Sequence, residues 1–145
     1  MATNNHGYVF DANLQFKDAY LVASSAAAQV SSADKIRDLG AGYFKGDLVV
    51  DITAIEVDTG NEKYEIEWQL SSSATFASGN VTAIVLKVGD SSVTGSSADN
   101  TTGRYTLPVH NEFGGTIYRY ARVYTRVAGT IATGINYTAY LAPRN

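Results

Sequence analysis

The sequence of 145 residues contains no cysteine, only two prolines and just 17% charged residues. Without cysteine, the chain can form no disulfide scaffold, no thiol nucleophile and no thiolate metal site. Its 14 acidic and 11 basic residues give a net charge of −3, so the chain as a whole lacks the excess of positive charge that is typical of nucleic-acid-binding proteins. Apolar runs of about 18 residues, long enough to span a membrane, are absent, and the N-terminal sequence MATNNHGYVF lacks the regions of a signal peptide. We therefore expect one non-exported domain with no membrane or nucleic-acid partner.

The residues that are abundant favour β-structure. Alanine, glycine, serine and threonine make up 58 of the 145 residues, and tyrosine supplies 10 of the 16 aromatic residues. Small polar residues and tyrosine suit pleated sheets that are joined by many turns. A chain of this mass can bury about two-thirds of its unfolded surface, which is enough for a core without disulfides or metals.

The clearest strand signal lies at residues 63–70, KYEIEWQL, where apolar and polar residues alternate without exception. A period of two places the four polar residues in water and the other four in a core, namely Tyr64, Ile66, Trp68 and Leu70. Residues 47–57 predict a second strand, in which the apolar parity switches at Thr53-Ala54 and so indicates a β-bulge. Residues 58–62, DTGNE, are typical of a hairpin turn between these two strands.

Four further strands are predicted at residues 81–88, 104–109, 116–127 and 135–141, with weaker strand segments between residues 20 and 39. Pro108 confines its strand to a sheet edge or a bend. About eight strands and no secure helix predict an all-β fold, a single-domain jelly-roll β-sandwich of antiparallel strands.

Residues 1–19 are predicted to form an extended N-terminal arm, and residues 20–145 the sandwich domain. Asparagine, glycine and aspartate interrupt any periodicity in this arm, whereas Tyr8, Phe10 and Phe16 make it too apolar for a solvated tail. Such a segment needs a surface to lie on. That surface belongs either to a partner, in which case these three residues are contact residues, or to the chain's own domain.

Candidate catalytic groups are few. The only imidazoles are His6, in the arm, and His110, in a predicted loop, and they form a poor metal or general-base pair. Glu65 and Glu67 share one face of a strand at a separation of about 7 Å, which a glycosidase could use. Alternating charge on a wet sheet face is the more ordinary interpretation of these two residues. We expect no enzyme activity, no metal and no cofactor.

The predicted strand at residues 116–127 has an unusual composition. One face carries Ile117, Ala121, Val123 and Val127; the other carries Tyr118, Tyr120, Arg122, Tyr124 and Arg126. Tyrosine and arginine are enriched at the energetic centres of protein interfaces. The second face is therefore either a partner-contact surface or a second buried sheet face with arginines at its rim.

Several segments also match the order and pattern of a known family. They are a Ser/Ala-rich segment that runs into Ile36-Arg37-Asp38-Leu39-Gly40, the pair Arg119-Tyr120, and the closing segment TGINYTAYL at residues 133–141. In these features, over about residues 14–142, the sequence resembles the jelly-roll capsid cement (head-decoration) proteins of tailed bacteriophages. None of these segments carries a catalytic motif.

The resemblance implies a structural virion protein on the exterior of a capsid, assembled in the cytoplasm of the host bacterium. Its partners would be neighbouring subunits of the phage major capsid protein. It would also self-associate as a homodimer or homotrimer at capsid symmetry axes. The alternative function is a glycan-binding jelly-roll module, in which exposed tyrosines and loop aspartates would hold a sugar.

Overall fold

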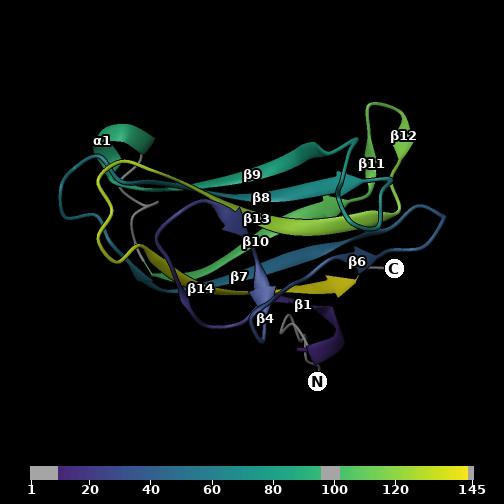
Figure 1. The fold of residues 1–145 in the computed structure, drawn as a ribbon, viewed down its shortest axis with the longest axis horizontal. Helices are drawn as coiled ribbons and strands as arrows, with labels where there is room; N and C mark the ends of the chain where they lie inside the picture. Colours follow the sequence, from purple (N-terminus) through teal and green to yellow (C-terminus); the bar gives the residue numbers. More distant parts are fainter. Residues whose placement is uncertain (1–9, 96–101, 144–145) are drawn as a thin grey trace, which may run out of the picture.

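The computed structural model describes residues 10–95 and 102–143, so Tyr8 and His6 lie outside the described residues. Two antiparallel sheets pack face to face as a sandwich (Figure 1). The first sheet contains, in spatial order, β1 (Gln15–Lys17), β14 (Ile135–Pro143), β7 (Lys45–Ile55) and β10 (Gly103–His110), with β2 (Leu21–Val22) also paired to β14. The second contains β3 (Ala26–Ala27), β13 (Tyr120–Ala128), β8 (Lys63–Ser71) and β9 (Val81–Gly89), with β6 (Arg37–Asp38) also paired to β13.

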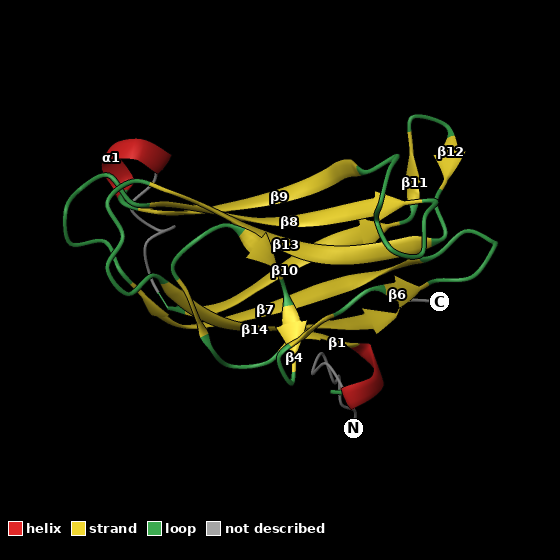
Figure 2. Ribbon diagram, in the orientation of Figure 1, coloured by secondary structure: helices red, strands yellow, loops and turns green. Residues whose placement is uncertain are grey.

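The remaining elements are short. Two small hairpins are formed by β4 (Gln29–Val30) with β5 (Ala33–Asp34), and by β11 (Glu112–Phe113) with β12 (Thr116–Ile117). Helical structure in the described residues is confined to one 3₁₀ turn, Ala12–Leu14, and to α1 (Ser91–Thr94) (Figure 2). No helix in these residues is long and apolar enough to cross a membrane. The prediction of an all-β antiparallel sandwich is confirmed, and the jelly-roll assignment stays a prediction.

The core lies between the sheets and follows the predicted alternation. All four apolar residues of the motif in β8 are fully buried, as are the alternate residues of β14, namely Ile135, Tyr137, Ala139 and Leu141. Trp68 packs edge-on against Phe16, with 5.4 Å between ring centroids. Its indole nitrogen donates to the backbone oxygen of His110 at 3.0 Å, so the largest core residue leaves no polar atom unpaired.

The predicted β-bulge is confirmed, but the predicted hairpin is wrong. Ile52 and Ala54 of β7 pair with consecutive residues of β14, which leaves Thr53 as the extra residue. The loop at residues 58–62 does not join paired strands, because β7 and β8 belong to different sheets. β7 is already paired on both sides, with β14 and β10, so it offers no free edge to β8.

The single strand predicted at residues 116–127 is also wrong. It is divided into β12 and β13, which belong to different sheets. The division arises because buried Asn111 binds the backbone of Tyr118 in both directions, by accepting from its N–H and donating to its oxygen. Ile117 was expected in the core but lies on the small hairpin, where 45% of its surface is exposed.

The N-terminal arm is shorter than predicted. Residues 15–17 form β1, which pairs with β14 as part of the sandwich. Of the two surfaces considered for Phe16, a partner or the chain's own domain, the structure shows the second: Phe16 is fully buried against Trp68. The prediction failed because three residues are too few to show a period.

Lys17 fastens β1 to β14 from inside the protein. It is fully buried, and its Nζ donates to the backbone oxygens of Asp18 at 3.1 Å, Tyr20 at 2.9 Å and Tyr137 at 2.8 Å. The rings of Tyr20 and Tyr137 lie 3.6 and 4.4 Å from the same nitrogen. Burial lowers the pKa of Lys17 to about 8, against an opposing effect of Asp18. No carboxylate in the described residues forms an ion pair with it.

Candidate protein-contact face

Four of the predicted contact residues come together on the outer face of β13. Tyr120, Arg122, Tyr124 and Arg126 alternate with Ala121, Val123 and Thr125, which are buried toward the core. We call these four residues, with the β8 and β9 side chains that contact them, the Tyr/Arg face. It lies on the outside of the second sheet.

The other predicted contact residues lie elsewhere. Tyr118 lies between β12 and β13, where the strand is interrupted. It is partly buried and packs against the core. Phe10 is 53% exposed and meets Tyr140 of β14 edge-on, with 5.3 Å between ring centroids. Phe10 therefore lies against the first sheet, away from the Tyr/Arg face.

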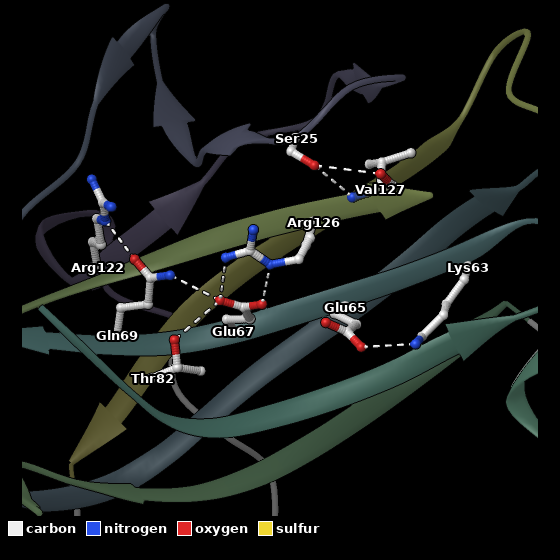
Figure 3. A network of polar contacts seen from close by, with 9 residues as sticks. All are labelled: Ser25, Lys63, Glu65, Glu67, Gln69, Thr82, Arg122, Arg126 and Val127. Atoms are coloured by element: carbon white, nitrogen blue, oxygen red, sulfur yellow. Dashed lines mark hydrogen bonds and ion pairs between the residues drawn. The ribbon is translucent and has the colours of Figure 1, made fainter. Parts of the chain in front are cut away.

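A buried carboxylate organises the centre of this face (Figure 3). Glu67 of β8 is only 3% exposed, and its oxygens accept from Arg126 Nε at 2.7 Å and Nη2 at 3.3 Å. The same carboxylate accepts from Gln69 Nε2 at 2.8 Å and from Thr82 Oγ1 at 3.2 Å. The prediction that this side of β8 faces water is wrong at Glu67 and Gln69, because the arginines of β13 lie over them, whereas Lys63 and Glu65 remain partly exposed.

The network continues from Glu67 to a second arginine. Gln69 is 5% exposed, and its Oε1 accepts from Arg122 Nε at 2.8 Å. Because the amide nitrogen of Gln69 donates to Glu67, its oxygen must face Arg122. A chain of four side chains therefore runs from Arg126 through Glu67 and Gln69 to Arg122.

The protonation state of Glu67 follows from its partners. Burial raises the pKa of Glu67, but hydrogen bonds from Arg126 and Gln69 outweigh it, and the net pKa lies below the ordinary value. The carboxylate is thus ionised at neutral pH. Its neighbour Glu65 pairs separately with Lys63 at 3.2 Å, so the two carboxylates that a glycosidase could use are each held by a different cation.

Aromatic rings and guanidinium groups stack along the face. The guanidinium carbon of Arg122 lies 4.5 Å from the ring centroid of Phe76 and 5.3 Å from that of Tyr124. Arg126 lies 5.1 Å from the same Tyr124 ring. Tyr124 therefore has an arginine on each side, and the stacked groups restrict one another's rotamers.

A small pocket of about 90 Å³ opens beside this network, lined by Lys63, Glu65, Arg126 and Ala128. Sites for small organic ligands usually enclose about 300 Å³ or more. This pocket is smaller than such a site.

His110 contributes nothing to this face, and His6 lies outside the described residues. His110 ends β10 half-buried, with its ring stacked on Tyr43 at 6.2 Å, and is not the exposed loop residue that we predicted. The described residues contain no group of three or more His, Asp or Glu side chains that could hold a metal ion.

The sequence indicated the arginines and tyrosines of β13 but not Gln69 or Phe76, and it indicated Glu67 only as a glycosidase carboxylate or a solvent-facing charge. The roles of Glu67 and Gln69 become visible only once β8 is known to pair with β13, since Gln69 lies opposite Arg122 in that register. Phe76 belongs to the loop after β8, and nothing in its local sequence indicates a contact with β13.

Neither a scan against models of known protein families nor a search of curated proteins finds a match for this chain.

Proposed function

We propose that this chain is a structural virion protein that binds the outer surface of a phage capsid and cements neighbouring major capsid protein subunits. The observation that carries the proposal is the Tyr/Arg face, a broad sheet surface whose arginine and tyrosine side chains are held in place before any partner arrives. Preorganised side chains of these types lose little conformational entropy on binding. The resemblance in sequence pattern to capsid cement proteins supplies the identity of the partner.

The arrangement of the strands supports the jelly-roll part of this proposal. Along the chain, β7, β8, β9, β10, β13 and β14 change sheets at every step except from β8 to β9. The resulting orders, β1-β14-β7-β10 and β3-β13-β8-β9, support the proposal of two interlocked Greek keys. Such a rigid two-layer domain suits a clamp that must hold several subunits at fixed spacing. Weak contacts to each subunit then add up through effective concentration.

The alternative of glycan binding finds less support at this face. A sugar stacks on an aromatic ring whose surface is free. The ring of Tyr124 lies between Arg122 and Arg126, at 5.3 and 5.1 Å.

Cosedimentation of the purified chain with undecorated heads of the phage that encodes it tests the proposal. The wild type should bind, and Tyr124→Ala should bind about tenfold more weakly because both stacked arginines lose their support. Tyr43→Ala is the matched control, since Tyr43 is 59% exposed but lies outside the Tyr/Arg face.

Two outcomes would contradict the proposal. One is that the wild type does not bind heads at all. The other is that Tyr124→Ala and Tyr43→Ala weaken binding equally, which would move the contact away from the Tyr/Arg face. Binding of the wild type to a glycan array, without binding to heads, would favour the alternative.

A further inference from the structure

Arg122 differs from the other accessible arginines in the part of the chain that the structure describes. Three arginines form close ion pairs with carboxylates: Arg104 with Asp51 at 2.7 Å, Arg119 with Asp38 at 2.8 Å and Arg126 with Glu67 at 2.7 Å. Arg37 forms no ion pair with a described carboxylate, and its Nε and Nη2 atoms are buried without a hydrogen-bond partner. Arg122 forms no ion pair with any described carboxylate, and its Nε donates only to the neutral amide of Gln69.

The position of Arg122 is nevertheless fixed. Its guanidinium group lies between the rings of Phe76 and Tyr124, and Gln69 anchors its Nε. Figure 3 shows its terminal nitrogens pointing away from Gln69 and from the rest of the network. An arginine held in this way needs little further ordering when it binds a planar anion.

The loop that supplies Phe76 is strained. Phe76 has a φ of +56°, in the left-handed region that a bulky residue rarely adopts. Its N–H donates to the oxygen of Ser73, and its own oxygen accepts from Asn80 Nδ2 at 3.0 Å, so the loop holds this conformation in place. The result is a buried ring directly against the guanidinium of Arg122. The backbone is therefore strained at Phe76, the residue whose ring helps to orient Arg122.

The charge of Arg122 is also poorly compensated. Burial lowers its pKa, and the nearby carboxylates of Asp34 and Glu67 act on it only through space. A guanidinium group remains protonated in spite of such shifts. A half-buried positive charge with open terminal donors gains most from a carboxylate, which can accept two parallel N–H bonds.

We propose that Arg122 is the residue of the Tyr/Arg face that receives an aspartate or glutamate side chain of the partner protein, in a two-bond guanidinium–carboxylate contact. The identity of that partner as a capsid subunit rests on the proposed function. The recognition of a carboxylate does not, and it can be tested on the isolated chain.

The test uses the full nitrogen-15-labelled chain and follows the arginine Nε–Hε signals by NMR. Acetylated tetraglutamate amide is titrated in, with the tetraglutamine analogue as the uncharged control, and Arg122→Lys identifies the signal of Arg122. We expect the Arg122 signal to shift with tetraglutamate and not with tetraglutamine. We expect little shift in the signals of the ion-paired arginines, because each of these guanidinium groups already binds a carboxylate of this chain. These arginines are Arg104, Arg119 and Arg126.

Three results would overturn the inference. They are an Arg122 signal that does not respond to tetraglutamate, an equal response of the ion-paired arginines, and a response to inorganic phosphate without one to tetraglutamate. The last would assign the site to a different anion.

Head binding then separates this inference from the proposed function. Arg122→Ala should weaken cosedimentation with heads about tenfold, whereas the control Arg104→Ala, on β10 of the first sheet, should have little effect. If heads bind the wild type and Arg122→Ala equally well, Arg122 does not contact the shell and the inference fails while the proposed function stands. If heads bind neither protein, the proposed function fails and the peptide titration alone decides the carboxylate site.

Discussion

The buried ammonium group of Lys17 predicts an unusual dependence of stability on pH. The pKa of Lys17 is lowered from 10.5 to about 8 in the folded protein. Below pH 8 the group is charged in both the folded and unfolded states, and burial of that charge opposes folding. Between pH 8 and 10.5 the folded state loses the proton first, so the free energy of unfolding should rise with pH.

The size of this effect follows from the two pKa values. One pKa unit corresponds to about 1.4 kcal/mol, and the whole window is worth about 3 kcal/mol. Between pH 7 and pH 10, most of the folded protein but little of the unfolded chain releases this proton. The contribution of Lys17 to the free energy of unfolding should therefore increase by about 2.5 kcal/mol over that range.

The assay is urea unfolding of the wild type and of Lys17→Met at pH 7, 8, 9 and 10, followed by tryptophan fluorescence. Trp68 is the only tryptophan in the sequence and is fully buried, so its emission reports unfolding of the core. Methionine preserves the approximate volume of the lysine stem and removes the titrating amine. The control Lys45→Met removes a lysine from an exposed position at the start of β7 and measures the effect of losing a surface charge.

The quantity to compare is the wild-type free energy of unfolding minus that of Lys17→Met. This difference cancels the titration of groups that both proteins share away from Lys17, such as Tyr64. The rings of Tyr20 and Tyr137 lie against Lys17, but burial raises their pKa values, so they stay mostly protonated up to pH 10. The difference should increase steadily from pH 7 to pH 10. A difference that stays constant or decreases would refute the idea that the folded protein holds Lys17 as a poorly solvated cation.

Three further predictions concern stability, each measured by urea unfolding. Phe16→Ala should lower the free energy of unfolding by about 3–5 kcal/mol, because Phe16 belongs to the core. A loss below about 1 kcal/mol would show that Phe16 lies on a surface arm. Gly134→Ala should prevent folding or lower the free energy of unfolding by several kcal/mol, since the added Cβ would lie 2.0 Å from the backbone oxygen of Val22. The control Gly60→Ala also stands at positive φ, but its Cβ would meet no atom, so it should lower the free energy of unfolding by only about 1 kcal/mol. Burial raises the pKa of Glu62, but hydrogen bonds led by those from Thr59 lower it to about 2. The carboxylate therefore stabilises the fold above pH 4.5 and loses this effect as pH falls through 2, so Glu62→Gln should flatten the acid side of the stability profile.

Local periodicity was sufficient to predict the interior of this protein. The alternating residues of β8 and β14 are buried because a strand of regular pleat exposes every second residue to one side, whatever it pairs with. The β-bulge at Thr53 could be recognised for the same reason, since an extra residue shifts the parity of its own strand. Such features depend on a few neighbouring residues.

Features that depend on pairing could not be predicted in this way. Nothing near residues 58–62 reveals that β7 is enclosed between β14 and β10, strands that come much later in the chain. Glu67 and Gln69 are residue types typical of a solvent-facing side of a sheet, yet they are buried because arginines of β13 cover them. Likewise, Arg122 belongs to a recognisable stripe, but its lack of a carboxylate follows from Glu67 binding Arg126 instead.

The pairing of β1 with β14 has a consequence for how the chain folds. These strands join Gln15 to Tyr140, and β14 follows every other strand of both sheets in chain order. During synthesis the first sheet cannot be completed before β14 is made, and until then Lys17 lacks the backbone oxygen of Tyr137 that later binds its ammonium group. Contacts of such long sequence separation make for slow folding. The second sheet, whose β8–β9 hairpin needs only local closure, is the part of the molecule best placed to form first.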